Sequence, residues 1–374
     1  MTLGPTLTAL ARREITWTGQ RYALGPMLTT ILIGAGGGAL AHPLGLPLPW
    51  MSGALIAVAA AALAGVRTAG LRMTFPLNLR YLFVPIVGVA IGGQFTPELL
   101  DAAAGWWLTL LVMFLYLPVA HLIGFVIYRH AGYGRVTALY AAMPGGLIEA
   151  VALGERAGGD VAALTLLQFS RLILCILCVP FAITLYEGVA VGSASGVSIG
   201  SATSSLGLWD VIVLTAAGAV GLLGGRWLGL PAAIITGPIL VSAAVHIAGL
   251  TAAHPPDFLI ALTQLVVGTA LGVRFVETER RAALRGLGWA AVTVALVLSL
   301  ALAVAAPLSL MTEETAEAIL LAFAPGGVTE MSLVALSLQI SVLFVTAHHV
   351  ARILFIVFMV TPTHAWLRRH RGWE

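Results

Sequence analysis

The sequence predicts an all-α polytopic membrane protein made of two inverted repeats. Each repeat is expected to hold about five transmembrane helices and one broken or re-entrant Pro-Gly-Gly segment. Three observations predict this fold: a strongly apolar composition, a Pro-Gly-Gly motif that occurs twice in matched surroundings, and an uneven distribution of Arg between the loops.

The composition places the chain in a membrane. Of its 374 residues, 59% are hydrophobic and only 9% are charged, whereas charged residues make up about 25% of a typical soluble domain. The mean hydropathy is +1.00. The net charge of +3 comes without any basic soluble domain, so the lipid bilayer is the expected partner and no nucleic acid is expected.

Twelve apolar segments follow one another along the chain, six in each half. A helix needs about 20 residues to cross a bilayer, so several of these segments are marginal. A stretch rich in Gly and Ser separates the halves, and we interpret it as a flexible linker. The expected segments are 27–41, 48–65, 77–95, 104–128, 137–153, 161–186, 208–224, 230–249, 257–275, 287–308, 315–337 and 340–362.

The N-terminal region is not typical of a secretory signal, because its apolar part is short and its Arg residues follow that part. We therefore expect it to be a cytoplasmic tail. The expected organisation is an N-terminal tail 1–26, a first membrane repeat 27–187, a Gly/Ser linker 188–207, a second membrane repeat 208–365 and a basic C-terminal tail 366–374.

The two halves repeat a motif at equal spacing. Pro144–Gly146 is followed by Glu149, and Pro325–Gly327 is followed by Glu330. In each half an Arg follows the Glu by 22 positions (171 − 149 and 352 − 330), inside the next apolar segment. An internal repeat of this extent indicates two copies of one architecture. Further matches are Leu44–Pro47 with Leu228–Pro231, Ser52–Gly53 with Thr236–Gly237, and Gly88–Phe95 with Gly268–Phe275.

The Arg residues indicate how the two copies are oriented. If all six segments of the first half crossed the membrane, both halves would point the same way. The Arg residues within 67–80, however, precede or begin the third segment of the first half, whereas those within 274–285 lie at or after the end of the third segment of the second half. Because positive loops favour the cytoplasm, we expect inverted halves with an odd number of crossings each. Both termini then lie on the cytoplasmic side of a bacterial inner membrane.

The segment with the Pro-Gly-Gly motif is the natural candidate for the one that does not cross. If it enters the membrane and returns as a re-entrant hairpin, five crossings per half place every Arg-rich loop in the cytoplasm. A broken helix that crosses fully, with another segment failing to cross, fits the charges almost as well. Both arrangements stay open at this point.

The Pro-Gly-Gly motifs are expected to break their helices inside the membrane. Proline lacks the amide donor and clashes with the preceding turn, and glycine adopts backbone angles that other residues resist. The freed backbone groups cannot face lipid, so they must face protein or a wet cavity. Amide groups at a half-helix N-terminus favour an anion, and exposed carbonyl oxygens favour a cation.

Glu149 and Glu330 are the carboxylates most clearly placed inside apolar segments. Such a group can hold and release a proton during transport, or bind Na⁺. An equally good interpretation is a static ion pair, Glu149 with Arg171 and Glu330 with Arg352. In the first interpretation the guanidinium groups bind an anionic ligand, because their rigid fork of donors suits a carboxylate.

The candidate binding residues group around these two motifs. No catalytic residue, metal or cofactor is expected, because the nine His are scattered and the adjacent His348 and His349 point in different directions from a helix. Cys175 and Cys178 are interpreted as small buried core residues. The candidate substrate- or ion-binding residues are Pro144, Gly145, Gly146, Glu149, Gln168, Ser170, Arg171, Pro325, Gly326, Gly327, Thr329, Glu330, His349 and Arg352.

At Met143–Glu149 and Ala324–Glu330 the chain resembles the AbrB family of duplicated bacterial membrane proteins, and the resemblance covers about residues 27–365. Proteins of this family are labelled as ammonia monooxygenases or as regulators of gene expression, and they differ from the small DNA-binding transition-state regulator of the same name. The resemblance implies an inner-membrane protein and supplies no catalytic residues. His349 stands where the first half has Gln168, which suggests that the two sites are chemically unequal.

Three functions compete. The leading prediction is an inner-membrane secondary transporter of a small anion or organic acid, coupled to H⁺ or Na⁺. The alternative is a membrane sensor that regulates gene expression indirectly. A monooxygenase is disfavoured, because oxygen activation needs clustered metal ligands and no ligand-spaced set occurs, so the chain is not expected to be an enzyme. The expected partners are a small-molecule or ion substrate, the lipid bilayer and further copies of the chain in a homo-oligomer.

Overall fold

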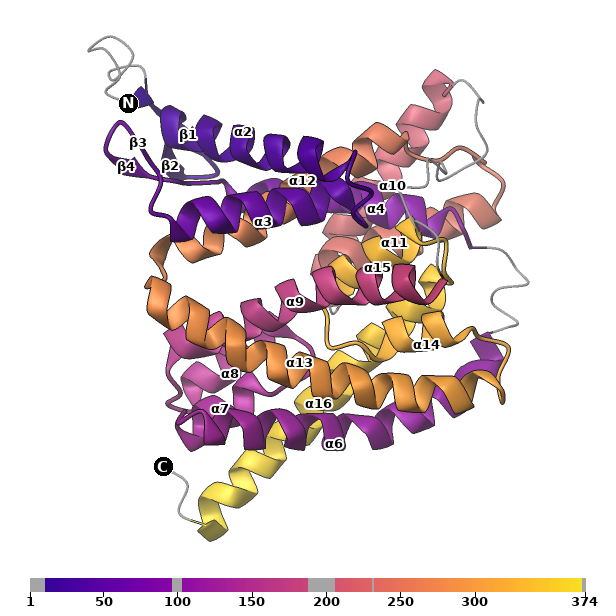
Figure 1. The fold of residues 1–374 in the computed structure, drawn as a ribbon. Helices are drawn as coiled ribbons and strands as arrows, with labels where there is room; N and C mark the ends of the chain where they lie inside the picture. The colour runs from indigo at the N-terminus through magenta and orange to yellow at the C-terminus, as the bar shows by residue number, and fades with distance from the viewer. Residues whose placement is uncertain (1–10, 96–102, 188–205, 231, 372–374) are drawn as a thin grey trace. The chain divides into compact units, whose positions relative to one another are not determined.

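The structure, a computed structural model, describes residues 11–95, 103–187, 206–230 and 232–371. These residues are mostly α-helical, and their strands form two short antiparallel hairpins (Figure 1). The strands are β1 (Glu14–Trp17), β2 (Gln20–Ala23), β3 (Arg67–Thr68) and β4 (Leu71–Arg72). The α-helices are α2 (Leu24–Ala41), α3 (Pro49–Leu63), α4 (Arg80–Gly92), α6 (Trp107–His130), α7 (Arg135–Ala141), α8 (Leu147–Arg156), α9 (Val161–Glu187), α10 (Leu208–Trp227), α11 (Ala233–Ile247), α12 (Asp257–Gly272), α13 (Arg280–Ser309), α14 (Ala316–Phe323), α15 (Val328–Ser337) and α16 (Val342–Arg371).

Seven helices among the described residues are long and apolar enough to cross a membrane, and shorter apolar helices, including α3, α4 and α11, accompany them. The prediction of an all-α polytopic membrane protein is therefore confirmed. Each of the twelve expected apolar segments contains helix, and the expected segments 137–153 and 315–337 each contain two short helices separated by a break. The number of crossings and the orientation of the halves remain predictions.

The chain forms two compact units, and these do not coincide with the two sequence halves. Unit 1 comprises Met1–Gln94 and Thr184–Ala282, and unit 2 comprises Phe95–Ile183 and Ala283–Glu374. Each unit therefore takes three of the expected apolar segments from the first half and three from the second. Both Pro-Gly-Gly motifs lie in unit 2.

The expected tails and linker lie partly outside the described residues, which leave out 1–10, 188–205 and 372–374. The described part of the expected N-terminal tail is the hairpin of β1 and β2, in which Glu14 lies opposite Ala23. Helix α2 starts directly after this hairpin. The described part of the expected C-terminal tail continues helix α16.

Within unit 1, matched glycines let matched helices touch. A Cβ on Gly53 of α3 would overlap the carbonyl oxygen of Gly37 of α2, and a Cβ on Gly237 of α11 would overlap that of Gly221 of α10. The second pair follows the first by 184 positions (221 − 37 and 237 − 53). The backbones of each helix pair are therefore in contact, which is how small residues favour helix association in lipid.

The third helix of each half packs against the second helix of the other half. A Cβ on Gly88 of α4 would lie 2.8 Å from the carbonyl oxygen of Ile235 of α11, and a Cβ on Gly268 of α12 would overlap that of Met51 of α3. Ile235 and Met51 are matched positions (235 − 51 = 184). In unit 1, helices of the first half therefore pack directly against helices of the second half.

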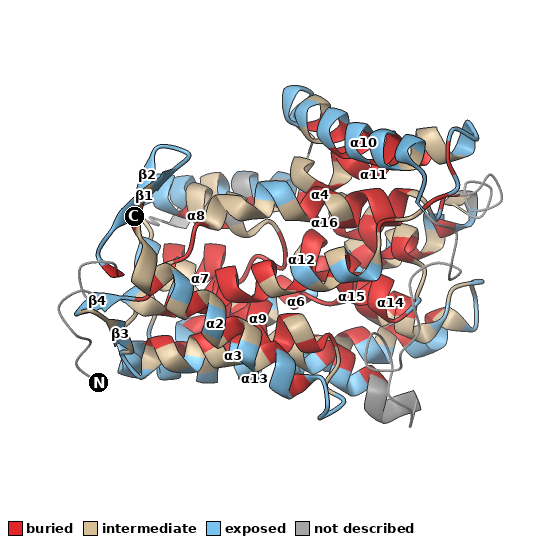
Figure 2. Ribbon diagram, turned by 90° about the horizontal axis from the view of Figure 1, so that it is seen from above, coloured by how far each residue is buried: buried red, intermediate tan, exposed pale blue. Residues whose placement is uncertain are grey.

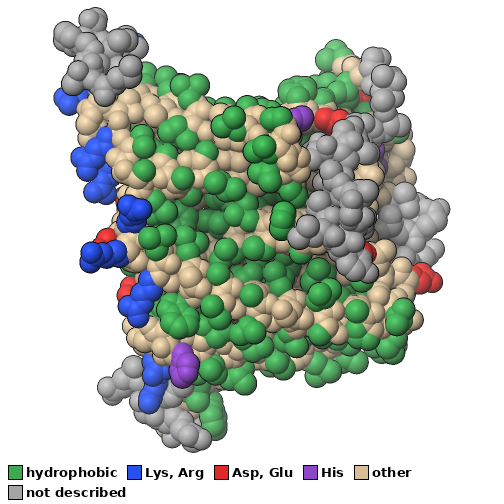
Figure 3. All heavy atoms as spheres, viewed as in Figure 1, with side chains coloured by type: hydrophobic (Ala, Val, Ile, Leu, Met, Phe, Trp, Pro, Cys, Tyr) green, Lys and Arg blue, Asp and Glu red, His purple; other side chains and the backbone are tan. Residues whose placement is uncertain are grey.

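In unit 2, α6 and α13 run antiparallel. Near one end of the two helices, Arg285 donates a hydrogen bond of 2.7 Å to the Ala131 carbonyl oxygen. Near the other end, the Trp106 indole donates one of 2.8 Å to Glu314. Within this unit, Figure 3 shows Arg side chains (blue) toward the first end, while Asp and Glu side chains (red) are visible toward both ends.

The core of unit 2 surrounds the two Pro-Gly-Gly motifs. Every residue of α15, which follows the second motif, is buried (Figure 2). Around the first motif a buried apolar cluster includes Tyr128 of α6, Met143, Leu164 of α9 and Ile356 of α16. Polar groups at the motifs are therefore shielded from solvent and need partners within the protein or in a bound ligand.

Candidate functional site

Each Pro-Gly-Gly motif forms a break between two short helices. Helix α7 ends at Ala141 and α8 begins at Leu147, while α14 ends at Phe323 and α15 begins at Val328. The residue before α8 is Gly146, whose φ of 64° lies in the left-handed region that favours glycine. The helix is thus interrupted at both expected places, and each interruption frees backbone groups that need partners.

Two guanidinium groups bind carbonyl oxygens of the breaks. Arg171 of α9 donates to the Met143 carbonyl oxygen. Arg352 of α16 donates to the carbonyl oxygen of Ala324 and, at 2.5 Å, to that of Gly326. Met143 and Ala324 are matched positions (324 − 143 = 181), as are the two Arg (352 − 171 = 181). The same bond is therefore built once in each half, just beyond the end of a helix, where the backbone dipole is negative.

A second matched pair of side chains, Gln168 and His349, contacts backbone carbonyl oxygens one helical turn away from the two Arg. Gln168 Nε2 donates to the Tyr140 carbonyl oxygen at 2.9 Å, and His349 Nε2 lies 3.1 Å from the Leu321 carbonyl oxygen. Both spacings are again 181 positions (349 − 168 and 321 − 140). His349 Nδ1 lies 2.6 Å from Arg352 Nη2, which can only donate, so Nδ1 accepts and the ring hydrogen is on Nε2.

Both guanidinium groups are almost completely buried, with exposed fractions of 4% for Arg171 and 0% for Arg352. Their donors turn to carbonyl oxygens, and neither forms an ion pair with a carboxylate of the described residues. The static pairing of Glu149 with Arg171 and of Glu330 with Arg352 is therefore not the arrangement found. The two positive charges repel each other, and a buried charge is costly without a counter-charge.

The two Glu residues lie at helix starts. Glu149 is the third residue of α8, and Glu330 is the third residue of α15. Each carboxylate folds back toward its helix start: a Cβ on Gly146 would lie 3.0 Å from Glu149 Oε2, and one on Gly327 would overlap Glu330 Oε2. A Glu at the third position is the residue that a capping box uses, and its charge suits the positive end of the helix dipole.

Several buried polar atoms of unit 2 have no hydrogen-bond partner among the described residues, including Gln168 Oε1, Ser170 Oγ, Arg171 Nε and Arg352 Nε. A Cβ on Gly145 would lie 2.9 Å from Arg352 Nε, so this guanidinium from the second half lies against the break of the first half. Buried polar atoms normally have partners. Unpaired ones at such positions need a partner, such as ordered water or a ligand.

The remaining candidates lie in the same unit. Pro144 and Pro325 are buried within the breaks, and Thr329 is buried at the second position of α15. One interpretation needs correction: Cys178 is exposed, although Cys175 is a buried core residue as expected. Within the described chain, no group of three or more His, Cys, Asp or Glu side chains is placed to hold a metal ion.

Tyr116 is a further candidate residue, which no sequence motif indicated. Its hydroxyl on α6 lies 3.2 Å from the Val297 carbonyl oxygen of α13 and 3.3 Å from that of Phe323, the last residue of α14. It therefore supplies a donor to the helix end before the second break. The matched position holds Val297 itself (297 − 116 = 181), so the repeat pattern contained no signal for this role.

A second polar cluster lies near Glu314, where α6 begins and α13 ends. A cavity of about 340 Å³ there is lined by residues that include Trp106, Thr109 and Glu314. Thr109 Oγ1 lies 2.8 Å from the buried His348 Nε2. Burial raises the pKa of the half-buried Glu314 above its ordinary value, the hydrogen bond from Trp106 opposes this, and the nearby Glu313 carboxylate adds to it.

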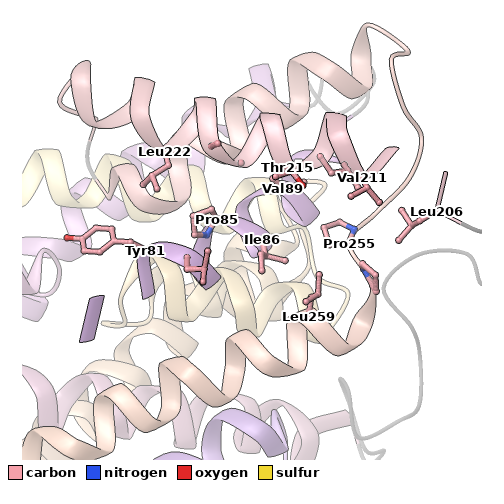
Figure 4. Close-up of a pocket in the computed structure, with 15 residues that line it drawn as sticks. Tyr81, Pro85, Ile86, Val89, Leu206, Val211, Thr215, Leu222, Pro255 and Leu259 are labelled. Carbon is pink, nitrogen blue, oxygen red and sulfur yellow. The ribbon is translucent and has the colours of Figure 1, made fainter. Parts of the chain in front are cut away.

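Unit 1 contains an apolar cavity of about 400 Å³ between α4, α10 and the start of α12 (Figure 4). Its lining is apolar apart from the hydroxyl groups of Tyr81 and Thr215. Such a lining does not suit a charged ligand. The labelled lining residues are Tyr81, Pro85, Ile86, Val89, Leu206, Val211, Thr215, Leu222, Pro255 and Leu259.

The fold is that of a polytopic α-helical membrane protein that contains two matched helix breaks. The chain belongs to the AbrB family: residues 50–368 match the family described as "Transition state regulatory protein AbrB". A similar protein of Bacillus subtilis (strain 168), "Uncharacterized protein YhjN", is 28% identical over 365 residues, which cover 91% of this chain and 93% of the relative. A relative in Escherichia coli (strain K12), "Putative regulator AbrB", is 24% identical over 302 residues, which cover 79% of this chain and 84% of the relative. The matched range contains both breaks, and the expected family is confirmed.

Proposed function

We propose that this chain is a secondary transporter of a small anion or organic acid in the bacterial inner membrane, coupled to H⁺ or Na⁺. The proposal is carried by the burial of Arg171 and Arg352 beside two helix breaks, with no carboxylate of the described residues on either guanidinium. A buried charge without a counter-charge is strongly destabilising, as the effect of removing one partner from a buried ion pair shows. A bound anion would supply the missing negative charge.

The backbone at the breaks favours an anion over a cation. The helix ends already have donors, because the carbonyl oxygens of Met143 and Ala324 accept from Arg. Helices α8 and α15 begin in the same breaks, and the start of a helix is electrostatically positive. Broken helices that present such ends hold substrates in several transporter folds.

Glu149 and Glu330 are the groups that we propose for ion coupling. Each stands near a helix start with its carboxylate folded back over the preceding glycine. While ionised, each carboxylate competes with a bound anion for the positive end of its helix. Binding of H⁺ or Na⁺ would weaken this competition, so that ion and anion would bind together.

The antiparallel α6 and α13 support inverted repeats, because they correspond to the fourth expected segment of each half. The helices around the breaks have 7, 10, 8 and 10 residues, and each is shorter than the about 20 residues that a crossing needs. These lengths favour re-entrant hairpins with five crossings per half. Both termini then lie in the cytoplasm, as the positive loops indicate.

The second candidate function is an indirect regulator or sensor, favoured by the printed name of the Escherichia coli relative. We propose no enzymatic role, because the polar side chains at the breaks mostly hold backbone carbonyl groups. The proposed partners are the substrate, the lipid bilayer and further copies of the chain, without nucleic acid.

The proposal is tested by thermal stabilisation of the detergent-purified protein against small anions, amines and metal ions. A ligand that binds the folded state raises the melting temperature. We expect organic or inorganic anions to do so. When Glu149→Gln and Glu330→Gln are combined, we expect the anion effect to persist but to become independent of H⁺ and Na⁺, because Gln lacks the charge that competes with the anion. A native protein stabilised only by amines or metal ions, or by no compound, would contradict anion binding.

A further inference from the structure

We infer that the ligand of unit 2 binds at the first break, and that it is a small carboxylate that also carries a hydroxyl or amino donor. The inference rests on the proposed anion transport and adds the position and chemistry of the ligand. It comes from a comparison of matched residues in the two halves, which differ in whether their polar atoms have partners.

The second half is closed at the position that matches Gln168, which means that all side-chain polar atoms there have hydrogen-bond partners within the protein. His349 Nε2 donates to the Leu321 carbonyl oxygen, and Nδ1 accepts from Arg352 at 2.6 Å. Both ring nitrogens therefore have partners within the protein. The residue that matches Ser170 is Ala351 (351 − 170 = 181), which has no polar atom.

The first half is open at the same positions, which means that some side-chain polar atoms there lack hydrogen-bond partners among the described residues. Gln168 Nε2 donates to the carbonyl oxygens of Tyr140 at 2.9 Å and Ala141 at 3.2 Å, which fixes the orientation of the amide. Its Oε1 then points away from these oxygens and has no partner among the described residues. Arg171 follows three positions later on the same helix face, and its Nε is likewise unpaired, as is the buried Ser170 hydroxyl.

The second guanidinium adds a donor to the first break. Arg352 Nε is buried and unpaired, and it lies where a Cβ of Gly145 would be 2.9 Å away. Two Nε donors on positive groups suit a carboxylate. The acceptor Gln168 Oε1 needs a hydrogen that a plain carboxylate does not have. A hydroxyl or amino group on the ligand supplies it.

Water alone does not complete this arrangement. An ordered water could accept from one Nε and donate to Gln168 Oε1. It would leave the charges of Arg171 and Arg352 unbalanced, with the cost of burying them unchanged. An anion that carries its own donor balances the charges of Arg171 and Arg352 and also gives Gln168 Oε1 a hydrogen-bond partner.

The test uses glycolate, acetate and sulfate with the full-length purified protein, because acetate lacks the hydroxyl of glycolate. Affinities are measured by calorimetry and by the shift in melting temperature. The first variant combines Gln168→His with Ser170→Ala, which puts into the first half the residues that stand at the matched positions of the second half. The second variant adds His349→Gln and Ala351→Ser, which moves the open arrangement to the second half.

We expect the native protein to bind glycolate about tenfold more tightly than acetate, since one hydrogen bond to a buried acceptor separates them. The first variant should lose at least about tenfold in glycolate affinity, and the second should regain part of it. Unchanged glycolate affinity in the first variant would overturn the inference. Loss without recovery, together with a lower melting temperature of the ligand-free protein, would also overturn it and assign Gln168 and Ser170 to packing. Binding of sulfate alone would refute the ligand class but leave anion transport standing, whereas binding of no anion would refute the proposed function itself.

Discussion

The Arg352 guanidinium lies against Gly145, because a Cβ at position 145 would come within 2.9 Å of Arg352 Nε. The Arg belongs to the second half of the chain and the Gly to the break of the first half. The same guanidinium holds the carbonyl oxygens of its own break. One side chain thus joins both breaks, and this contact leads to the first prediction.

Gly145→Ala should displace the Arg352 guanidinium. The new methyl group meets Arg352 Nε rather than the end of a flexible apolar chain, and overpacking of this kind costs about 1–3 kcal/mol. We expect a lower melting temperature and weaker anion binding in the same variant. Gly288→Ala on the exposed face of α13 is the matched control, because nothing lies within 4 Å of its added Cβ. The control should gain up to about 1 kcal/mol from helix propensity, and equal losses in both variants would contradict the contact.

Arg352→Lys should destabilise the protein more than Arg171→Lys does. Arg352 donates to Ala324, Gly326 and His349, whereas Arg171 donates to Met143. A Lys ammonium cannot reproduce the planar fork of donors. The expected loss in free energy of unfolding is about 2–4 kcal/mol for Arg352→Lys and about half of that for Arg171→Lys. Denaturation curves of the two variants measure this difference, and the reverse order would disprove the assignment of these bonds.

The contribution of Glu314 to stability should grow as the pH falls from neutral toward the acidic range. Burial raises the pKa of Glu314 above its ordinary value of 4.5. A raised pKa in the folded state means that the contribution is fully present below the ordinary pKa and is lost as the pH rises through the raised one. Glu314→Gln keeps an acceptor for the Trp106 indole and should remove the contribution of Glu314 to the pH dependence of stability.

Melting temperatures of Glu314→Gln over a pH series test this expectation. Glu155→Gln, at an exposed position of α8, serves as the control and should keep the native pH profile. A profile that is unchanged in Glu314→Gln would show that the buried carboxylate does not contribute to it.

Gly268→Ala should destabilise unit 1. A Cβ at this position overlaps the Met51 carbonyl oxygen, so α12 and α3 would have to separate. Lost packing between these helices should cost about 1–3 kcal/mol. Gly224→Ala in α10, where nothing lies within 4 Å of the added Cβ, should be neutral or stabilising. Equal melting temperatures for the two variants would refute close helix contact at Gly268.

Helix positions could be predicted from sequence, because apolar runs and the Pro-Gly-Gly motifs act locally. The exchange of contacts between halves could not be predicted, since Gly88 meets Ile235 and Gly268 meets Met51 only after both halves fold together. Aligning the two halves identifies which residues are equivalent, but it does not show whether each residue contacts its own half or the other one.

The candidate site was found by its motifs, but the partners of its charged residues were not. Pairing of Glu330 with Arg352 was a natural expectation from charge. The break, however, frees carbonyl oxygens that take the Arg donors, and Glu330 at the third helix position folds back toward Gly327. The spacing Gly-x-x-Glu at a helix start was the available signal, because a Glu at this position is typical of a capping box.

Uptake into proteoliposomes tests the central claim most directly. The protein is reconstituted in bilayer vesicles, and uptake of a labelled anion that stabilises it is followed with and without an imposed H⁺ or Na⁺ gradient. We predict saturable uptake that a gradient of one of these ions accelerates, and we predict its absence when Arg171→Lys and Arg352→Lys are combined. Binding of the anion without any uptake by the native protein would contradict transport and favour a sensor.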